Sequence, residues 1–194
     1  EFPIYLDSPM SVNATHIYRD YHADHDLTEG DLDNEHSVLN GPRLHLAKSV
    51  AASKQINEVR GPAVIISSSG MMVGGRILHH LKKRLPDKRN TILLGGFMAY
   101  GTRGRALQEG ATTLRIHGRD VPVNAAVEKI SGLSGHADRS ELLRWLAPYD
   151  DKPPSKTFIT HGELDSATAL RDTLFEQWNR EVIVPKLGES FELG

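Results

Sequence analysis

Short apolar runs that alternate with helical segments are the feature that most limits how this chain can fold. The segments 63–66 and 91–94 are nearly continuous apolar runs, and each is followed by a glycine-rich stretch and then by a helical pattern. Such runs are typical of strands in a parallel sheet that is covered on both faces. Alternating strands and helices indicate an α/β fold. We therefore predict a mostly parallel or mixed sheet with both faces covered.

Local signals set the expected elements. Ser8 before Pro9 is an N-cap followed by proline at the first helical position, and Asp138 with Glu141 has the spacing of a capping box. We predict strands at 2–6, 43–47, 63–66, 91–94, 114–117, 121–130, 156–160, 182–184 and 191–193. We predict helices at 9–23, 49–59, 76–85, 103–108, 138–146 and 163–179, with a polar loop at 24–40.

Composition excludes several classes of protein. Hydrophobic residues make up 39% of the 194 residues, which is enough for a core, and cysteine is absent. Disulfides, zinc ribbons and thiol nucleophiles are therefore excluded, and the chain fits a reducing compartment. No apolar run is long enough to span a bilayer. We predict a cytoplasmic protein with no membrane partner.

The formal net charge of −2 conceals a strong segregation of charge. Residues 76–119 carry ten bases and two acids, a net +8, whereas residues 1–35 carry nine acids and one base, a net −8. A basic block of this kind binds a polyanion in some proteins and is a solvated surface in others. Charge alone leaves both interpretations open.

Two glycine-rich loops are the candidate phosphate-binding segments. They follow the strands at 63–66 and 91–94 and occupy 67–76 and 95–105. Glycine lets a backbone approach a ligand closely, and backbone N–H groups before a helix suit a phosphate. Neither loop matches a known nucleotide fingerprint, so tight turns with incidental arginines are the alternative. The candidate residues are Ser68, Ser69, Gly70, Arg76, Gly101, Thr102 and Arg103.

Two histidines follow predicted strands in equivalent positions. His136 lies in a Gly/Ser loop after the strand that ends near residue 130, and His161 follows the strand that ends near residue 160. If these are parallel strands of one strand–helix–strand unit, both imidazoles project from the same sheet edge. Ordinary loop histidines are the alternative. The chain has no HxHxDH or HExxH motif, so it lacks a complete set of zinc ligands.

Five segments, in order, resemble the β-CASP branch of the metallo-β-lactamase superfamily, which includes RNA-processing nucleases. They are 3–10, 68–76, 96–102, 130–138 and 160–163, and the last two are similar to motifs B and C of that family. The resemblance implies a Rossmann-like β-CASP portion with a mostly parallel sheet at residues 1–125. It implies the C-terminal part of a metallo-β-lactamase αββα core at residues 126–194.

The resemblance also implies site roles. His161 is similar to a late zinc ligand, and His136 is similar to the motif B residue that acts near the scissile phosphate as a general acid or electrostatic stabiliser; Asp138 and Glu163 support these two. The implied activity is zinc-dependent hydrolysis of RNA phosphodiester bonds, with RNA held by the basic glycine loops. Two zinc ions are expected in the full-length enzyme.

Motifs of the family that would precede residue 1 are absent, so we expect the C-terminal part of a ribonuclease. The isolated chain is then expected to be inactive and not to retain zinc. Its expected partners are RNA and the missing N-terminal catalytic half, with self-association through unpaired sheet edges. Two other functions stay open, a stand-alone RNA-binding or regulatory module and a Rossmann-like enzyme for a small phosphorylated ligand.

Overall fold

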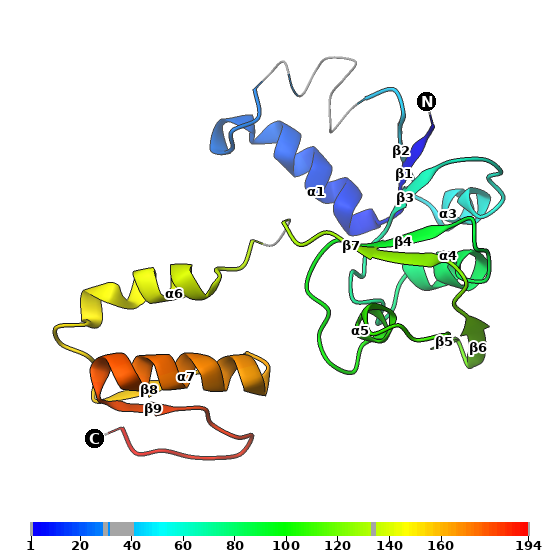
Figure 1. The fold of residues 1–194 in the computed structure, drawn as a ribbon. Coiled ribbons are helices and arrows are strands. Elements are labelled where there is room, and N and C mark those ends of the chain that lie inside the picture. Colours follow the sequence, from blue (N-terminus) through cyan, green and yellow to red (C-terminus); the bar gives the residue numbers. More distant parts are fainter. Residues whose placement is uncertain (1, 29–30, 32–40, 133–134, 194) are drawn as a thin grey trace. The chain divides into compact units, whose positions relative to one another are not determined.

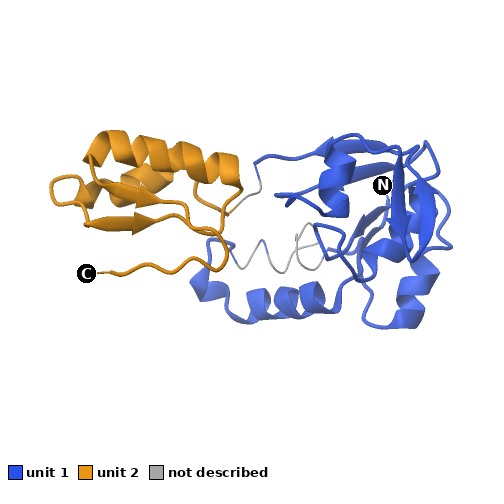
Figure 2. Ribbon diagram, turned by 90° about the horizontal axis from the view of Figure 1, so that it is seen from below, with its two compact units in different colours: residues 1–134 blue, residues 135–194 orange. Residues whose placement is uncertain are grey.

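The computed structural model describes residues 2–28, 31, 41–132 and 135–193. The chain divides into two compact units, Glu1–Ser134 and Gly135–Gly194 (Figure 2). Each unit has its own sheets and its own hydrophobic cluster. Part of the predicted loop at 24–40 and residues 133–134 of the motif B segment lie outside the described residues.

The first sheet of unit 1 has three parallel strands in the order β2-β1-β3 (Figure 1). Its strands are β1 (Ile4–Leu6), β2 (Leu44–Leu46) and β3 (Val64–Ile66). Helix α1 (Pro9–Asp20) begins after Ser8, whose hydroxyl accepts the Ser11 N–H, and the short helix η1 (His22–Asp24) follows it. Helix α3 (Val50–Ile56) is capped in the same way by Ser49. The two serine caps satisfy N–H groups that a helix start leaves open.

The second part of unit 1 contains the main hydrophobic core. Strand β4 (Thr91–Leu94) pairs in parallel with β7 (Ala126–Lys129), and α4 (Ile77–Arg84) and α5 (Arg103–Gln108) supply helices. Strands β5 (Thr113–Ile116) and β6 (Arg119–Pro122) form an antiparallel hairpin. The core residues are apolar side chains from α4, β4, α5, the hairpin and their connections: Met72, Leu78, Leu81, Leu85, Leu94, Met98, Leu107, Leu114, Ile116, Val121 and Ala125.

The prediction of a sheet covered on both faces is wrong for the strands that suggested it. Val64 and Ile66 of β3 and Leu93 of β4 are exposed, although their neighbours are partly or fully buried. Side chains of a strand alternate between the two faces of its sheet. Within the described residues of unit 1, one face of each strand therefore has no cover, and a continuous apolar run cannot reveal that.

The predicted strand at 121–130 forms two strands instead of one. Strand β6 belongs to the hairpin, whose two-residue turn is His117-Gly118, with positive φ at both positions. Positive φ at both central residues is the geometry of the tight hairpin turn that fits the strand twist. After β6 the backbone N–H groups of Asn124 and Ala125 donate to the Leu85 carbonyl. The chain then enters β7 beside β4.

Unit 2 packs a helix pair and a two-stranded parallel sheet. It contains α6 (Arg139–Leu146), η2 (Ala147–Tyr149), β8 (Lys156–Phe158), α7 (Leu164–Trp178) and β9 (Glu181–Ile183). Its cluster of Leu174, Trp178 and Val182 is small, and the Trp178 indole N–H donates to Asp150 Oδ1 at 2.7 Å. The predicted strand at 191–193 is not a strand. Its contacts include the Phe191–Phe158 ring pair and a Lys156 Nζ bond to the Glu192 carbonyl, which are not a strand ladder.

Most predicted elements are confirmed in type and order, with ends that move by a few residues. Strand β7 pairs with β4 within unit 1, and β8 pairs with β9 within unit 2. A shared sheet edge for His136 and His161 stays a prediction. Within the described part of the chain, no helix combines the length and the apolar character that crossing a bilayer requires.

Candidate nucleic-acid interface

A buried carboxylate lies at the end of β1. Asp7 is fully buried, and its Oδ1 accepts a hydrogen bond from Arg76 Nη1 at 2.8 Å. Its Oδ2 accepts one from Ser53 Oγ at 2.6 Å and lies 2.6 Å from His80 Nε2. The opposite side of the His80 ring, Nδ1, lies 3.0 Å from Asn57 Oδ1. Asp7 thus joins β1 to α3, to the start of α4 and to its second turn.

These contacts shift the Asp7 carboxyl toward its charged form. Burial raises the pKa, but the hydrogen bonds with Ser53, His80 and Arg76 lower it more, and the net pKa is below the usual value of 3.8. A buried carboxylate that accepts several charged or strong donors stays ionised. Asp7 therefore balances the positive charge of Arg76 inside the fold.

The loop after β3, residues 67–76, is held at both ends by Asp7 and its neighbour. Ser67 Oγ donates to the Asp7 carbonyl at 2.9 Å, and the hydroxyls of Ser68 and Ser8 lie 2.7 Å apart. At the other end, Arg76 binds the Asp7 carboxylate. The backbone N–H groups of Ser69 and Gly70 make no hydrogen bond to the rest of the described chain. The centre of the loop therefore has free N–H groups that can donate hydrogen bonds to a phosphate oxygen.

The loop after β4, residues 95–105, is fastened to the first loop. The Gly104 N–H donates to the Met71 carbonyl at 3.1 Å, and Arg103 Nη1 donates to the Met72 carbonyl at 3.1 Å. Arg103 Nε also donates to the Arg115 carbonyl at 2.7 Å. These bonds join the segments that follow β3 and β4 into one surface at the carboxyl ends of two strands. Ligands of open α/β sheets bind at such edges.

Two residues of the second loop fix its local shape. Thr102 caps α5, since its Oγ1 accepts the Arg105 N–H at 3.2 Å and donates to the Ala99 carbonyl at 2.7 Å. Gly101 has a φ of 77°, which L side chains rarely adopt. Gly104 has close neighbours, because a Cβ there would meet Met98 Sδ and lie 3.3 Å from Met71 Cα. The glycines serve a turn and a close approach of the two loops.

Two exposed aromatic side chains lie on the same loop, and sequence reasoning missed them. Tyr100 is 82% exposed and Phe97 is 48% exposed. Exposed aromatic rings next to glycine-rich backbone are the groups on which unpaired bases stack. The sequence did contain a signal for them, since Phe97 directly follows two glycines and Tyr100 directly precedes Gly101.

The motif residues of unit 2 lie around the starts of α6 and α7. His136 and His161 are both exposed, and His161 has a φ of 66°. Asp138 forms the predicted capping box with Glu141, in which each side chain accepts the other residue's backbone N–H. Those bonds with Glu141 N–H and the Ser140 hydroxyl lower the pKa of Asp138. Glu163 is the residue before α7, and its side chain makes no cap.

Two family models match this chain. The Beta-Casp domain matches residues 1–107, which is more than half of the chain. The Zn-dependent metallo-hydrolase RNA specificity domain matches residues 120–185. The chain belongs to the β-CASP family.

Curated relatives of this β-CASP chain are named as a ribonuclease and as transcription termination factors. It is 34% identical over 188 residues to Ribonuclease TTHA0252 of Thermus thermophilus, which covers 96% of this chain and 42% of the relative. It is 32% identical over 195 residues to the transcription termination factor FttA of Thermococcus kodakarensis, covering 95% and 29%. The FttA of Pyrococcus abyssi is 34% identical over 179 residues, covering 87% and 27%. The chain thus spans less than half the length of these relatives.

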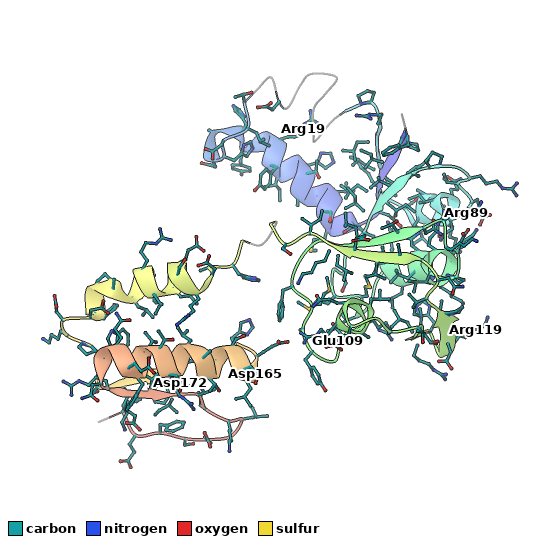
Figure 3. All side chains as sticks on the ribbon, in the orientation of Figure 1. Arg19, Arg89, Glu109, Arg119, Asp165 and Asp172 are labelled. Atoms are coloured by element: carbon teal, nitrogen blue, oxygen red, sulfur yellow. The ribbon has the colours of Figure 1, made fainter. Side chains whose placement is uncertain are left out.

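The cations of the basic block in this β-CASP chain are mostly engaged within the fold. Arg103 and Arg84 donate to main-chain carbonyls, and five others bind carboxylates. The carboxylate pairs are Arg76–Asp7, Lys83–Glu58, Arg89–Asp87, Arg105–Glu109 and Arg115–Asp120. Figure 3 shows Arg89 beside the start of β4 and Arg119 on the β5–β6 hairpin. The block therefore presents less free positive charge than its +8 implies.

The description of the second family model names zinc, and the donor groups of this chain decide whether it can hold the metal. In the described ranges, no three His, Asp or Glu residues lie close enough to hold a metal ion. Asp7 and His80 form a buried pair of possible metal donors, but Arg76 and Ser53 occupy the carboxylate. The described residues of this β-CASP chain do not make a zinc site by themselves.

Proposed function

We propose that this chain is the RNA-holding part of a metal-dependent ribonuclease that hydrolyses phosphodiester bonds. The observation that carries the proposal is the joining of loops 67–76 and 95–105 by Arg103 and Gly104 into one surface. That surface offers backbone donors and exposed aromatic rings. The RNA specificity model matches another part of the chain, residues 120–185, and supports RNA as the substrate of the protein as a whole.

The surface has separate groups for phosphate and for base. Ser68, Ser69 and Gly70 offer hydroxyl and N–H donors to phosphate oxygens. The Arg103 guanidinium has five N–H donors, and its carbonyl contacts use those on Nε and Nη1. Tyr100 and Phe97 stack on unpaired bases. Thr102 and Gly101 contribute through the shape of the loop as well as by direct contact.

The two motif histidines have different proposed roles. His136 holds or delivers a proton near the scissile phosphate, as a general acid or an electrostatic stabiliser. Its loop is followed by the Asp138 capping box, which fixes the start of α6. His161 supplies one ligand to a zinc centre whose other ligands come from the remainder of the protein, and zinc there would polarise the phosphate. Glu163 supports the His161 loop.

The rest of the proposal concerns the whole protein. The relatives are more than twice as long as this chain, which supports a larger enzyme with a catalytic half outside it. In that arrangement the present chain alone binds RNA but does not cleave it. We place the enzyme in the cytoplasm, where RNA processing occurs, and expect self-association through unpaired sheet edges.

Binding of labelled single-stranded RNA to the chain tests the proposal. Fluorescence anisotropy with a 15-nucleotide RNA at several salt concentrations should show binding that weakens as salt rises. Inorganic phosphate and AMP are the comparison probes, and they should compete only at far higher concentrations. Absence of RNA binding at low salt, or tight binding of AMP alone, would contradict the proposal and favour a small phosphorylated ligand.

A further inference from the structure

We propose that Asp7 is a positioning residue for the RNA-holding loop 67–76, and that Arg76 acts through Asp7 instead of contacting RNA. The inference rests on the proposed function and deepens it. It gives Arg76, the one arginine of this loop, an indirect role in holding the loop in place of direct contact with phosphate.

The charges around Asp7 support an internal role for Arg76. The Arg76 side chain is 19% exposed, and its Nη1 donates both to Asp7 Oδ1 and to the Ala47 carbonyl at 2.8 Å. Its Nη2 lies 3.5 Å from the Lys48 carbonyl. A guanidinium held in this way must give up its bonds to the protein before it can form a bidentate pair with a phosphate.

Asp7 contacts both ends of the loop. The carboxylate of Asp7 holds Arg76 at the C-terminal end of the loop, and the Asp7 carbonyl accepts the Ser67 hydroxyl at the N-terminal end. Gly75 packs against the Ser68 carbonyl, where a Cβ would lie 3.3 Å from the oxygen. One buried residue therefore sets the separation and direction of both loop ends.

The Asp7 carboxylate is also bonded to two helices of unit 1, α3 and α4. Ser53 comes from α3 and His80 from α4, and both are buried. Asn57, just after α3, contacts the second nitrogen of the His80 ring. These bonds link two helices to the loop, so the free donors of Ser69 and Gly70 are held in one arrangement. Preorganised donors bind without the cost of ordering the loop.

Isosteric removal of the charge tests the inference. Asp7→Asn keeps the shape but weakens the bonds to Arg76 and His80. If the loop then holds its binding arrangement for only a tenth of the time, RNA affinity falls about 10-fold, with the salt slope unchanged. Hydrogen exchange of the amides at 67–71 should become faster in free protein. Glu58→Gln is the matched control, because Glu58 pairs with Lys83 and thereby joins the end of α3 to α4 at the surface.

Milder variants keep the test decisive if Asp7→Asn does not fold. Ser53→Ala removes one bond to Asp7 Oδ2 and should give a smaller loss of affinity in the same direction. Arg76→Gln should match Asp7→Asn, and the double variant should lose no more than either single one. If Arg76 contacts phosphate directly, Arg76→Gln lowers the salt slope by about 1.

The outcomes separate the two proposals. Wild-type RNA affinity in folded Ser53→Ala and Asp7→Asn proteins would overturn the positioning role and leave the RNA-binding function standing. A lowered salt slope in Arg76→Gln alone would also overturn it. Failure of the wild-type chain to bind RNA would instead overturn the proposed function, and hydrogen exchange of the loop would still report whether Asp7 positions it.

Discussion

The Nε2 atom of His80 lies 2.6 Å from Oδ2 of Asp7, and neither side chain is more than 3% exposed. The Asp7 carboxylate is ionised and can only accept, so His80 Nε2 carries the proton of this bond. The pair connects the end of β1 to the second turn of α4, across 73 positions of sequence. This bond is part of the buried polar network from which the candidate RNA surface extends.

The stability of unit 1 should depend on the ionisation of Asp7. Its folded pKa is lowered, so the stabilisation is complete above the unfolded value of about 3.8 and is lost as the pH falls through the lower folded value. Asp7→Asn should reduce the free energy of unfolding at pH 7 by about 3 kcal/mol, because it leaves Arg76 without its buried partner. Urea unfolding at pH 7 and pH 3 measures both effects.

The free energy of unfolding of Asp7→Asn should also depend less on pH than that of the wild type. The difference in unfolding free energy between wild type and Asp7→Asn should shrink as the pH drops below 4. An equal difference at both pH values would show that the carboxylate charge contributes nothing to the fold.

Tyr100 should contribute to RNA affinity through stacking. Tyr100→Ala should weaken binding of single-stranded RNA about 5-fold or more, since stacking of one base on an aromatic ring contributes about 1–3 kcal/mol. Tyr100→Phe should restore most of the affinity, because the ring remains. Anisotropy titrations at constant salt measure this. Tyr21→Ala is the control, since Tyr21 is also exposed and lies at the end of α1; an equal loss there would exclude a specific role for Tyr100.

Gly104 should tolerate no side chain. Gly104→Ala places a Cβ against Met98 Sδ and 3.3 Å from the Met71 carbonyl oxygen. Overpacking of this kind costs about 1–3 kcal/mol, which exceeds the helix propensity that alanine adds. Thermal unfolding should show the loss. Gly96→Ala has open space around its Cβ and should unfold at nearly the wild-type temperature. Equal melting of both variants would show that the two loops are not closely packed there.

Substitution of the two motif histidines should have different effects in the full-length protein. His161→Ala should lose about one zinc ion per chain, because it removes the proposed ligand. His136→Ala should keep the metal content and lower the cleavage rate by about 100-fold or more, the range of general acid catalysis. Metal analysis and single-turnover cleavage of RNA measure the two effects. Loss of zinc in His136→Ala would reverse the assignment.

The sequence predicted the elements well because their signals are local. Ser8, Ser49, Thr102 and Asp138 all cap helices within three residues of themselves, and the apolar runs define the strands. The motif segments also predicted the family, which the two family models confirm. The roles of the individual site residues stay predictions, including those of His136 and His161.

The partners of the strands and of the charged side chains could not be predicted from local signals. Strand β7 pairs with β4, and the side chains of Val64 and Leu93 face outward, because long-range contacts choose partners and faces after the local elements exist. The formal +8 of residues 76–119 likewise gave no sign that Glu58, Asp7 and Asp120, all outside the block, pair with its cations.

By itself, the sequence determined where this chain forms helices, strands and glycine loops, because capping and backbone preferences act over a few residues. Only the tertiary structure decided that Asp7, Ser53, Arg76 and His80 meet in one buried network and that Arg103 joins two loops. Those residues are far apart in sequence, and their contacts exist only after burial removes water and makes each unpaired polar group costly.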